Sequence, residues 1–230
     1  MSRLTIQEKR HETVRKILDT AIPVFAEVGF AGARIDDIAL RSGVNKATIY
    51  YRIGDKEALY TRVLHEVFAD TAERLMRNVN EAKTPEEKLR TYIRNIIQTV
   101  GKNPSLPPIF LRELASGGRH FPGVVLNDLS RIIGALMESL KEGVEKGEFI
   151  KASPLTLHLM VAGGTLLFRT IESIKEKRPE VAELINQVFQ GGADKFGEEI
   201  ENIILQGVKK EGSRPATKTA GKDSRGRGFR

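Results

Sequence analysis

The amino-acid sequence predicts an all-α protein. Apolar residues recur at offsets of three and four through most segments between residues 10 and 208, as amphipathic helices require. Helix-start signals separate these segments; for example, Thr84-Pro85-Glu86-Glu87 has the pattern of a capping box with proline at the first helical position. Residues 30–59 contain two short helical patterns around a glycine. Together these observations predict an N-terminal three-helix domain with a helix-turn-helix, followed by a larger helical domain.

The N-terminal domain should span residues 10–56, behind a flexible polar arm over residues 1–9. Its first helix should end at Gly29, and Pro23 inside the helix predicts a kink. The apolar face of this helix comprises Val14, Ile17, Leu18, Ala21, Phe25 and Val28.

Residues 35–52 have the pattern of two short helices joined by a tight turn. Ile35 and Ile38 mark the buried face of the first helix, and Gly43 supplies the permissive backbone of the turn. Asn45 is a suitable N-cap for a second helix over residues 46–51, in which Ile49 points inward. Polar and aromatic residues crowd the rest of that helix. This arrangement is typical of a DNA-reading helix-turn-helix, although an αα-hairpin with tyrosines in a core remains an alternative from spacing alone.

Five short motifs carry a more specific signal over roughly residues 10–70. They are Gly29-Phe30, Ile35-Asp36-Asp37-Ile38-Ala39, Gly43-Val44, Thr48-Ile49-Tyr50-Tyr51 and Asp55-Lys56-Glu57-Ala58-Leu59. With these motifs the sequence resembles the N-terminal domain of TetR/AcrR-family regulators. The rest of the chain resembles that family only in helical character and length. The resemblance implies an operator-binding homodimer with a small-molecule cavity in the larger domain.

The sequence departs from the family pattern at two places. Ala33 and Arg34 stand where hydroxyl residues usually open the first helix of the motif, so we expect Asp36 or Asp37 to serve that helix N-terminus. Arg52 and Ile53 replace a His and a Phe.

The DNA-contacting residues should lie mainly on the second helix of the motif. Lys46 and Ala47 should face base edges, where lysine donates to guanine and alanine meets a thymine methyl group. The others should hold phosphates and set the register. The full predicted set is Arg34, Lys46, Ala47, Thr48, Tyr50, Tyr51, Arg52 and Lys56.

The larger domain should span residues 57–208. Asp55 should cap a helix that runs from Lys56 to about residue 80 and connects the two domains. Further helices are expected at about residues 85–100, 109–115, 124–146, 155–168 and 179–208. The apolar run 155–168 has 14 residues, too few to cross a bilayer, so it should be buried within the protein or at a subunit interface.

The last two helices should form a four-helix interface with a second subunit. Glycines in these helices are costly unless they allow close approach of another helix; a loop at Gly191-Gly192 is the alternative. The candidate interface residues are Met160, Gly164, Phe189, Gly192, Phe196 and Ile200.

The effector cavity implied by the resemblance has candidates in which apolar side chains lie beside polar ones. They are Tyr92, Phe110, His120, Phe121, Met137, His158, Thr165, Phe168 and Arg169. His120-Phe121 and Arg169 are the preferred members, because a polar group beside large apolar ones needs a partner.

Composition excludes several other functions. The chain has no cysteine and hence no disulfide or thiolate site, which fits the cytoplasm. Residues 1–11 contain no apolar run of the kind that a signal peptide needs. The four histidines lack partners at metal-ligand spacing, and no phosphate loop or nucleophile elbow occurs. We therefore expect no metal, no cofactor, no membrane and no enzyme activity.

The positive charge lies at the two ends of the chain. The net charge is +7, of which residues 209–230 contribute +6 and residues 1–56 contribute +3, so residues 57–208 are slightly negative. The basic stretch 209–230 has little to bury and should be a disordered tail. This distribution favours a local nucleic-acid surface.

The sequence thus predicts a homodimeric repressor that binds a palindromic operator and is released by a small hydrophobic effector. Two alternatives remain open. One is a helical enzyme or lipophilic-ligand carrier with an incidental helical hairpin. The other is an architectural DNA-binding protein that responds to no effector.

Overall fold

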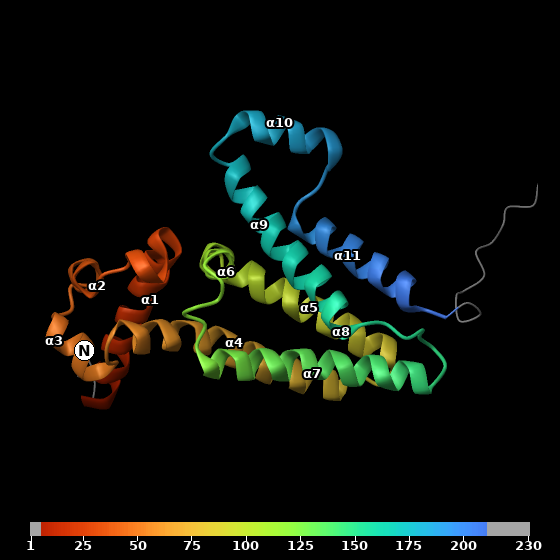
Figure 1. Cartoon of the computed structure of the whole chain (residues 1–230), viewed down its shortest axis with the longest axis horizontal. Helices are drawn as coiled ribbons and strands as arrows, with labels where there is room; N and C mark the ends of the chain where they lie inside the picture. The colour runs from red at the N-terminus through yellow and green to blue at the C-terminus, as the bar shows by residue number, and fades with distance from the viewer. Residues whose placement is uncertain (1–5, 211–230) are drawn as a thin grey trace, which may run out of the picture.

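The computed structural model describes residues 6–210, and the regular secondary structure of that stretch is helical. A small N-terminal module, α1–α3, is joined by the long helix α4 to a helical body, α5–α11 (Figure 1). The all-α prediction is confirmed. The elements are α1 Ile6–Gly32, α2 Ile35–Ser42, α3 Lys46–Arg52, α4 Lys56–Glu81, α5 Pro85–Lys102, α6 Leu106–Ala115, α7 Gly123–Glu145, α8 Pro154–His158, a π-helical turn Leu159–Gly163, α9 Gly164–Lys175, α10 Pro179–Val188 and α11 Ala193–Val208.

Helix α1 begins earlier than predicted, and its regular geometry is interrupted at the predicted end, Gly29. It begins at Ile6, so residues 6–9 are helical; residues 1–5 of the expected arm lie outside the described stretch. The backbone leaves helical geometry at Gly29, with φ 70° and ψ 178°, whereas Pro23 lies inside the helix. The interruption is therefore at the glycine, which adopts a positive φ without a Cβ clash.

Local hydrogen bonds shape the helix-turn-helix as the sequence indicates. Gly43 ends α2 in the left-handed conformation at φ 61°, and the Val44 N–H donates back to the Ala39 carbonyl at 3.2 Å. The Asn45 side chain accepts from the Ala47 N–H at 2.8 Å and so caps α3. Arg34 precedes α2 in an extended conformation and makes no side-chain cap.

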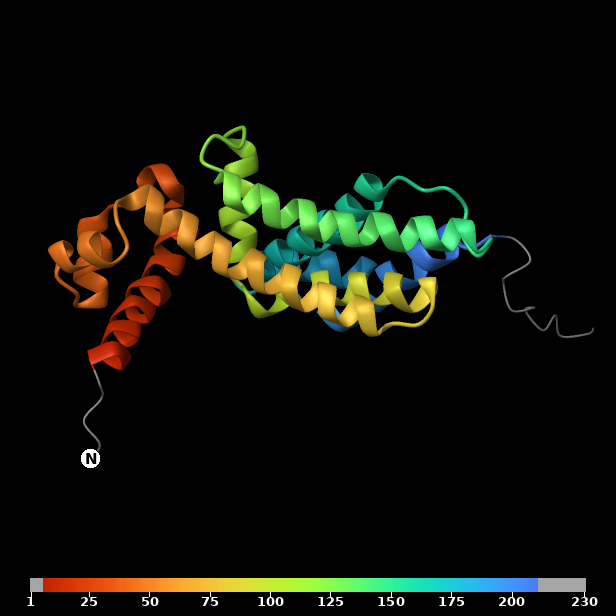
Figure 2. The same cartoon turned by 90° about the horizontal axis from the view of Figure 1, so that it is seen from below.

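Helix α4 runs from the N-terminal module into the body (Figure 2). The Asp55 side chain caps it by accepting from the Ala58 N–H at 2.8 Å. In the body it packs against α5 and α7. Its buried residues extend along its whole length: Leu59, Tyr60, Val63, Leu64, Phe68, Thr71, Ala72, Leu75 and Val79.

An ion-pair cluster fixes α11 to α5. Glu201 on α11 is buried and accepts from Arg94 at 2.7 and 2.9 Å and from Arg90 at 2.5 Å. Burial alone would raise the pKa of Glu201, but the hydrogen bonds from Arg94 and Arg90 outweigh it and hold that pKa below its ordinary value. Glu201 therefore stays charged at neutral pH.

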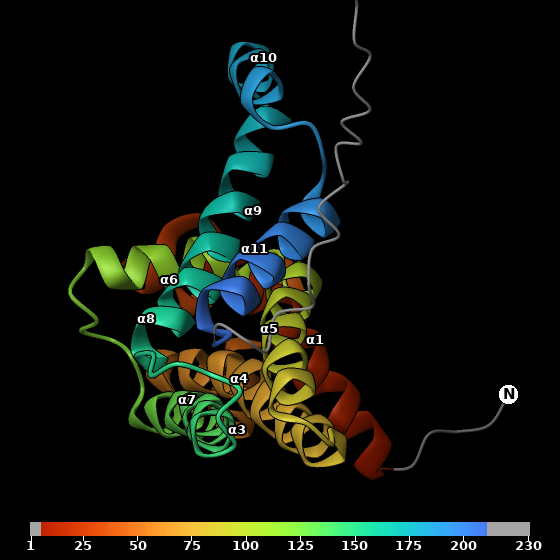
Figure 3. The same ribbon diagram turned by 90° about the vertical axis from the view of Figure 1, so that its right-hand side faces the viewer.

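The single helix predicted over residues 179–208 is wrong. The chain leaves the helix after Val188 and α11 begins at Ala193, so the break at Gly191-Gly192 is the correct alternative. Helix α10 buries none of its residues and projects away from the body (Figure 3). The Phe168 ring on α9 stacks on Phe196 at 4.1 Å between centroids, and Phe189 packs edge-on against Phe168.

This ring cluster changes the assignment of most dimer candidates. Phe189 and Phe196 pack on Phe168 of the same chain, and Ile200 of α11 lies against Gly164 of α9. Gly192 lies in the turn before α11. Met160 is the member of the predicted set that remains an exposed apolar side chain.

The prediction of a disordered tail from residue 209 is wrong for its first two residues. Lys209 pairs with Glu86 at 2.8 Å, and the Lys210 N–H donates to the Glu148 carbonyl at 3.0 Å. Both residues therefore belong to the body, and the remaining tail residues, 211–230, lie outside the described stretch.

Two glycines of α7 provide a matched test of the packing of Phe149 against this helix. A Cβ on Gly143 would overlap the ring of the buried Phe149, whereas a Cβ on Gly134 would meet open space. Gly143→Ala should lower the free energy of unfolding in urea by about 1–3 kcal/mol through overpacking. Gly134→Ala should raise it by about 0.5–1 kcal/mol, because alanine favours the helix. Equal effects of the two substitutions would contradict the packing described.

Candidate nucleic-acid interface and effector cavity

Helix α3 directs its polar and aromatic residues outward. Ile49 is fully buried, whereas Lys46, Ala47 and Tyr50 are exposed and Tyr51 is 81% exposed. The αα-hairpin alternative requires these tyrosines to fill a core, and in the structure they do not. An outward helix with donors and rings has the form of a recognition helix for the major groove.

Lys46 is held by the preceding helix. Its Nζ lies 2.7 Å from Asp36 Oδ1 on α2, and both side chains are exposed. The hydrogen bond to Asp36 raises the pKa of Lys46 above its ordinary value. Asp36, which was expected to serve the N-terminus of α2, thus holds Lys46, the residue predicted to face base edges.

Lys56 does not extend toward solvent, contrary to the prediction of a mobile phosphate-binding cation. Its Nζ donates to the carbonyl of Phe30 at 3.0 Å and to that of Ala33 at 3.2 Å. The same atom lies 4.5 Å from the centroid of the Phe30 ring. Lys56 therefore holds α4 against the end of α1.

The other predicted DNA contacts occupy different environments. Arg34 is exposed, and Thr48 is half-buried. The Arg52 guanidinium lies 5.6 Å from the Tyr51 ring centroid, while its Nε is buried and has no hydrogen-bond partner among residues 6–210. Arg52 thus lies beside Tyr51 at the end of α3.

A second set of contacts joins the N-terminal module to the body. The His120 ring packs on Phe30 at 4.4 Å between centroids, and the His120 N–H donates to the buried Glu113 at 2.6 Å. Arg112 donates to the Glu27 carbonyl at 3.0 Å. His120 was predicted to line the effector cavity; the structure places it at this junction instead.

The body contains a small, partly open apolar cavity of about 50 Å³. It lies between α4, α5, α6, α7 and the continuous helix Pro154–Lys175 that comprises α8, the π-helical turn and α9. This volume holds a water molecule or two and is far below the roughly 300–1,000 Å³ of a typical ligand site. Its walls are Phe68, Thr71, Ile96, Thr99, Val100, Leu106, Phe110, Leu129, Ile132, His158, Ala162 and Leu166.

Two of the nine predicted pocket residues, Phe110 and His158, line this cavity. Two others lie directly behind them: the Phe121 ring packs edge-on against Phe110, and the Tyr92 hydroxyl lies 2.6 Å from His158 Nδ1. Thr165 is buried but donates to the Val161 carbonyl at 2.6 Å within its own helix.

The remaining pocket candidates lie elsewhere. Met137 is 55% exposed on α7, and Phe168 belongs to the ring cluster with Phe196. Arg169 pairs with Glu172 at 3.1 Å beside a separate, open hollow that includes Gly101. Arg169, chosen because a polar group among apolar ones needs a partner, therefore has that partner on its own helix and not in the cavity.

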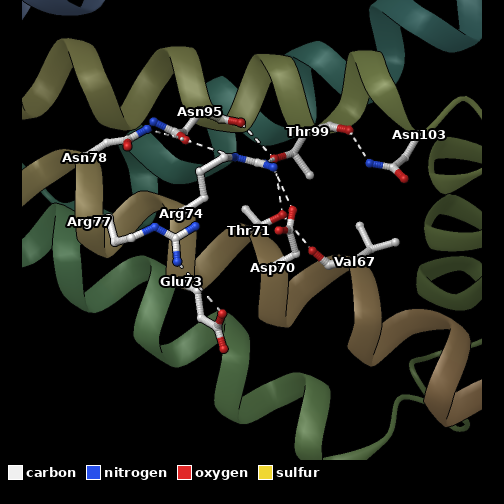
Figure 4. Close-up of polar contacts among 10 residues, drawn as sticks. All are labelled: Val67, Asp70, Thr71, Glu73, Arg74, Arg77, Asn78, Asn95, Thr99 and Asn103. Atoms are coloured by element: carbon white, nitrogen blue, oxygen red, sulfur yellow. Dashed lines mark hydrogen bonds and ion pairs between the residues drawn. The ribbon is translucent and has the colours of Figure 1, made fainter.

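Sequence reasoning missed a polar network beside the cavity. Arg74 on α4 donates to Thr99 on α5 at 2.8 Å and to Asp70 at 2.6 Å, and approaches Asn95 at 3.4 Å (Figure 4). Thr71 and Thr99 also form the cavity wall. Their only signal in the sequence was a polar residue at a position where the helical periodicity places apolar ones.

The sequence matches two family descriptions that together cover residues 17–210. Residues 17–63 match "Bacterial regulatory proteins, tetR family", and residues 64–210 match "YcdC-like protein, C-terminal region". The chain belongs to the TetR family. These matches confirm the family resemblance predicted from the helix-turn-helix motifs. Members of this family are DNA-binding transcriptional regulators and not enzymes.

Similar TetR-family proteins cover most of the chain. The transcriptional regulator RutR of Escherichia coli (strain K12) is 26% identical over 85% of this chain and 90% of its own length. The repressor NicS of Pseudomonas putida is 29% identical over 67% of this chain and 74% of its own.

Solved structures share the fold. FadR of Bacillus subtilis, in complex with stearoyl-CoA, superposes with a TM-score of 0.66 at 20% identity, over 84% of this chain and 98% of that one. KstR2 of Mycobacterium tuberculosis superposes with a TM-score of 0.65 at 19% identity, over 90% of this chain and 98% of that one.

Lys56 and Lys46 should behave as opposites on substitution. Lys56→Met removes two hydrogen bonds to carbonyls and should lower the free energy of unfolding by about 2 kcal/mol, with little change in the salt dependence of DNA binding. Lys46→Met should leave the unfolding midpoint almost unchanged and weaken operator binding, because Lys46 is predicted to contact base edges. Urea titration and fluorescence anisotropy measure the two quantities; a reduced salt slope for Lys56→Met would restore its predicted role as a phosphate contact.

Proposed function

We propose that this TetR-family regulator is a homodimeric repressor that binds a palindromic operator and leaves it when an apolar effector enters the body. In this proposal residues 10–56 form the DNA-binding domain and residues 57–208 form the effector-binding and dimerisation domain. The observation that carries it is the exposed face of α3, from Lys46 to Tyr51. The protein would act in the cytoplasm, where its DNA lies.

A single copy of α3 touches too few base pairs for useful affinity. Two copies related by a twofold axis can enter successive major grooves about 34–36 Å apart. In each copy, Lys46 and Ala47 would meet base edges while Tyr50, Tyr51 and Arg52 hold phosphates. The twofold symmetry of the protein then requires a palindromic operator.

An apolar stripe on the body supports the second copy. Leu155, Leu159 and Leu167 are exposed on one helix, and Gly163, at the same four-residue spacing, has open space where a Cβ would be. Ile203 and Gly207 repeat the pattern of an exposed branched residue and an open glycine on α11. Small residues allow helices to approach closely, so a partner helix fits both stripes.

The helix that carries Leu155, Leu159 and Leu167 could instead lie against a membrane. Pro154–Lys175 is long and apolar enough to cross a membrane by length and composition. However, it packs against α5, α6 and α11 on its other sides, and Arg169 and Glu172 lie in its last turns. A second subunit covers one apolar face while leaving these charges in water, which favours the dimer.

The effector part of the proposal depends on the cavity. Its walls are mostly apolar, and relatives include a fatty acid metabolism regulator of Bacillus subtilis and the FadR structure that holds stearoyl-CoA. At about 50 Å³ the cavity must enlarge to admit a ligand. A ligand that binds the enlarged form more tightly than the compact form shifts the conformational equilibrium toward the enlarged form. The protein then leaves the DNA if the spacing of the two α3 helices in the enlarged form no longer fits the operator.

Substitutions in α3 should separate base readout from phosphate contact. Tyr50→Phe should weaken binding to every operator by about fivefold, because it removes one phosphate hydrogen bond. Lys46→Ala should change the preferred base at one position in each half-site by about 1–3 kcal/mol. Gel shifts on the upstream region of the protein's own gene, with single-base variants, measure both effects.

The same gel shifts distinguish the alternatives. Steep salt dependence with sequence preference supports the regulator, whereas salt dependence without preference indicates an architectural protein. Absence of DNA binding would indicate a lipophilic-ligand carrier and contradict the proposal.

The dimer can be tested with matched surface leucines. Leu167 in the stripe is 54% exposed, and Leu184 on α10 is 60% exposed. Leu167→Glu places a charge on each side of the proposed interface and should raise the dimer dissociation constant at least about 100-fold, whereas Leu184→Glu should leave it unchanged. Sedimentation velocity over a concentration series measures this; a monomeric wild-type protein at micromolar concentration would refute the dimer.

A further inference from the structure

The hydroxyl groups in the cavity wall have no proton left for a ligand. Thr71 Oγ1 donates to the Val67 carbonyl at 2.7 Å, and Thr99 Oγ1 donates to the Asn95 carbonyl at 2.8 Å. Each hydroxyl carries a single proton. Thr99 also accepts from Arg74 at 2.8 Å, so the polar network of Figure 4 occupies this side of the cavity.

His158 is the remaining polar side chain of the wall, and Tyr92 fixes its orientation. His158 is 9% exposed, and its Nδ1 lies 2.6 Å from the Tyr92 hydroxyl. The fully buried Tyr92 hydroxyl has no other partner among residues 6–210, and burial raises its pKa, so it remains a phenol whose proton must go to Nδ1.

The position of the imidazole proton follows. Burial lowers the pKa of His158, which keeps the ring neutral at pH 7. A neutral imidazole that accepts at Nδ1 carries its proton at Nε2. Within the described stretch no acceptor is bonded to Nε2. Nε2 is therefore a donor without an acceptor on a residue of the cavity wall, whereas Nδ1 is directed to Tyr92, which does not line the cavity.

We propose that the cavity takes an uncharged apolar molecule with one hydrogen-bond acceptor, such as a ketone or ester carbonyl, which receives the proton of His158 Nε2. This inference rests on the proposed effector function and specifies the class of ligand. A carboxylate or an ammonium group would be buried without a counter-charge, because no charged side chain lines the wall. Arg74, which donates to Thr99 of the wall, is already paired with Asp70.

Nitrogen NMR on protein labelled at the histidine ring tests the tautomer without DNA or ligand. At neutral pH, His158 should show an unprotonated Nδ1 and a protonated Nε2. Tyr92→Phe should move the Nδ1 signal, because it removes the phenol that donates to that nitrogen. A His158 that is protonated at Nδ1, or at both nitrogens, would overturn the inference.

Two isosteric probes test the ligand class. Cyclohexanone and methylenecyclohexane differ in replacing a carbonyl oxygen by a methylene group. The matched variant is the double substitution His158→Leu with Tyr92→Phe, which removes the donor and leaves no unpaired phenol. In the double variant, the dissociation constant of cyclohexanone divided by that of methylenecyclohexane should rise about tenfold. The reason is that the ketone loses its hydrogen bond from His158 Nε2.

Methyl-region NMR titrations measure these constants, and thermal unfolding shows that the double variant is folded. An unchanged ratio, failure of cyclohexanone to bind at its solubility limit, or tighter binding of cyclohexanecarboxylate would overturn the inference. Gel shifts with cyclohexanone are read separately. If the probe binds at His158 and DNA is not released, the ligand site stands and the proposed effector function fails.

Discussion

The continuity of α4 is the constraint on which the rest of the structure depends. Its first turns carry Leu59 and Tyr60 into the core beneath the N-terminal module, and its middle carries Phe68 and Thr71 into the cavity wall. An α-helix of 26 residues without an internal break transmits a displacement from one end to the other. Any change in cavity volume therefore acts on a helix that also packs against α1 of the N-terminal module.

Helix α6 provides a second mechanical connection of the same kind. Leu106 and Phe110 line the cavity, while at the other end Arg112 donates to the Glu27 carbonyl of α1 and Glu113 accepts from Tyr60 of α4. Ten residues thus join the cavity to the N-terminal module. Because α4 and α6 both line the cavity and both contact α1, an enlarged cavity would act on helices that hold the N-terminal module.

The sequence determined the features that depend on near neighbours in the chain. Gly43, Asn45, Asp55 and Thr84 shape the ends of helices by hydrogen bonds to residues at most four positions away. Such bonds form wherever the local pattern occurs, so the helix-turn-helix and its family resemblance could be recognised without a structure. Helical periodicity likewise identified Ile49 as buried and its neighbours as outward.

Tertiary structure decided which buried faces meet. Periodicity shows that a face is covered and says nothing of what covers it. Phe196 and Ile200 were assigned to a second subunit, whereas in the structure they contact α9 of the same chain and are half-buried. Lys56 met carbonyls more than 20 positions earlier, and His158 met Tyr92 across 66 positions. Only the packing of distant helices could bring these partners together, and it is that packing which leaves His158 as the one free donor of the cavity wall.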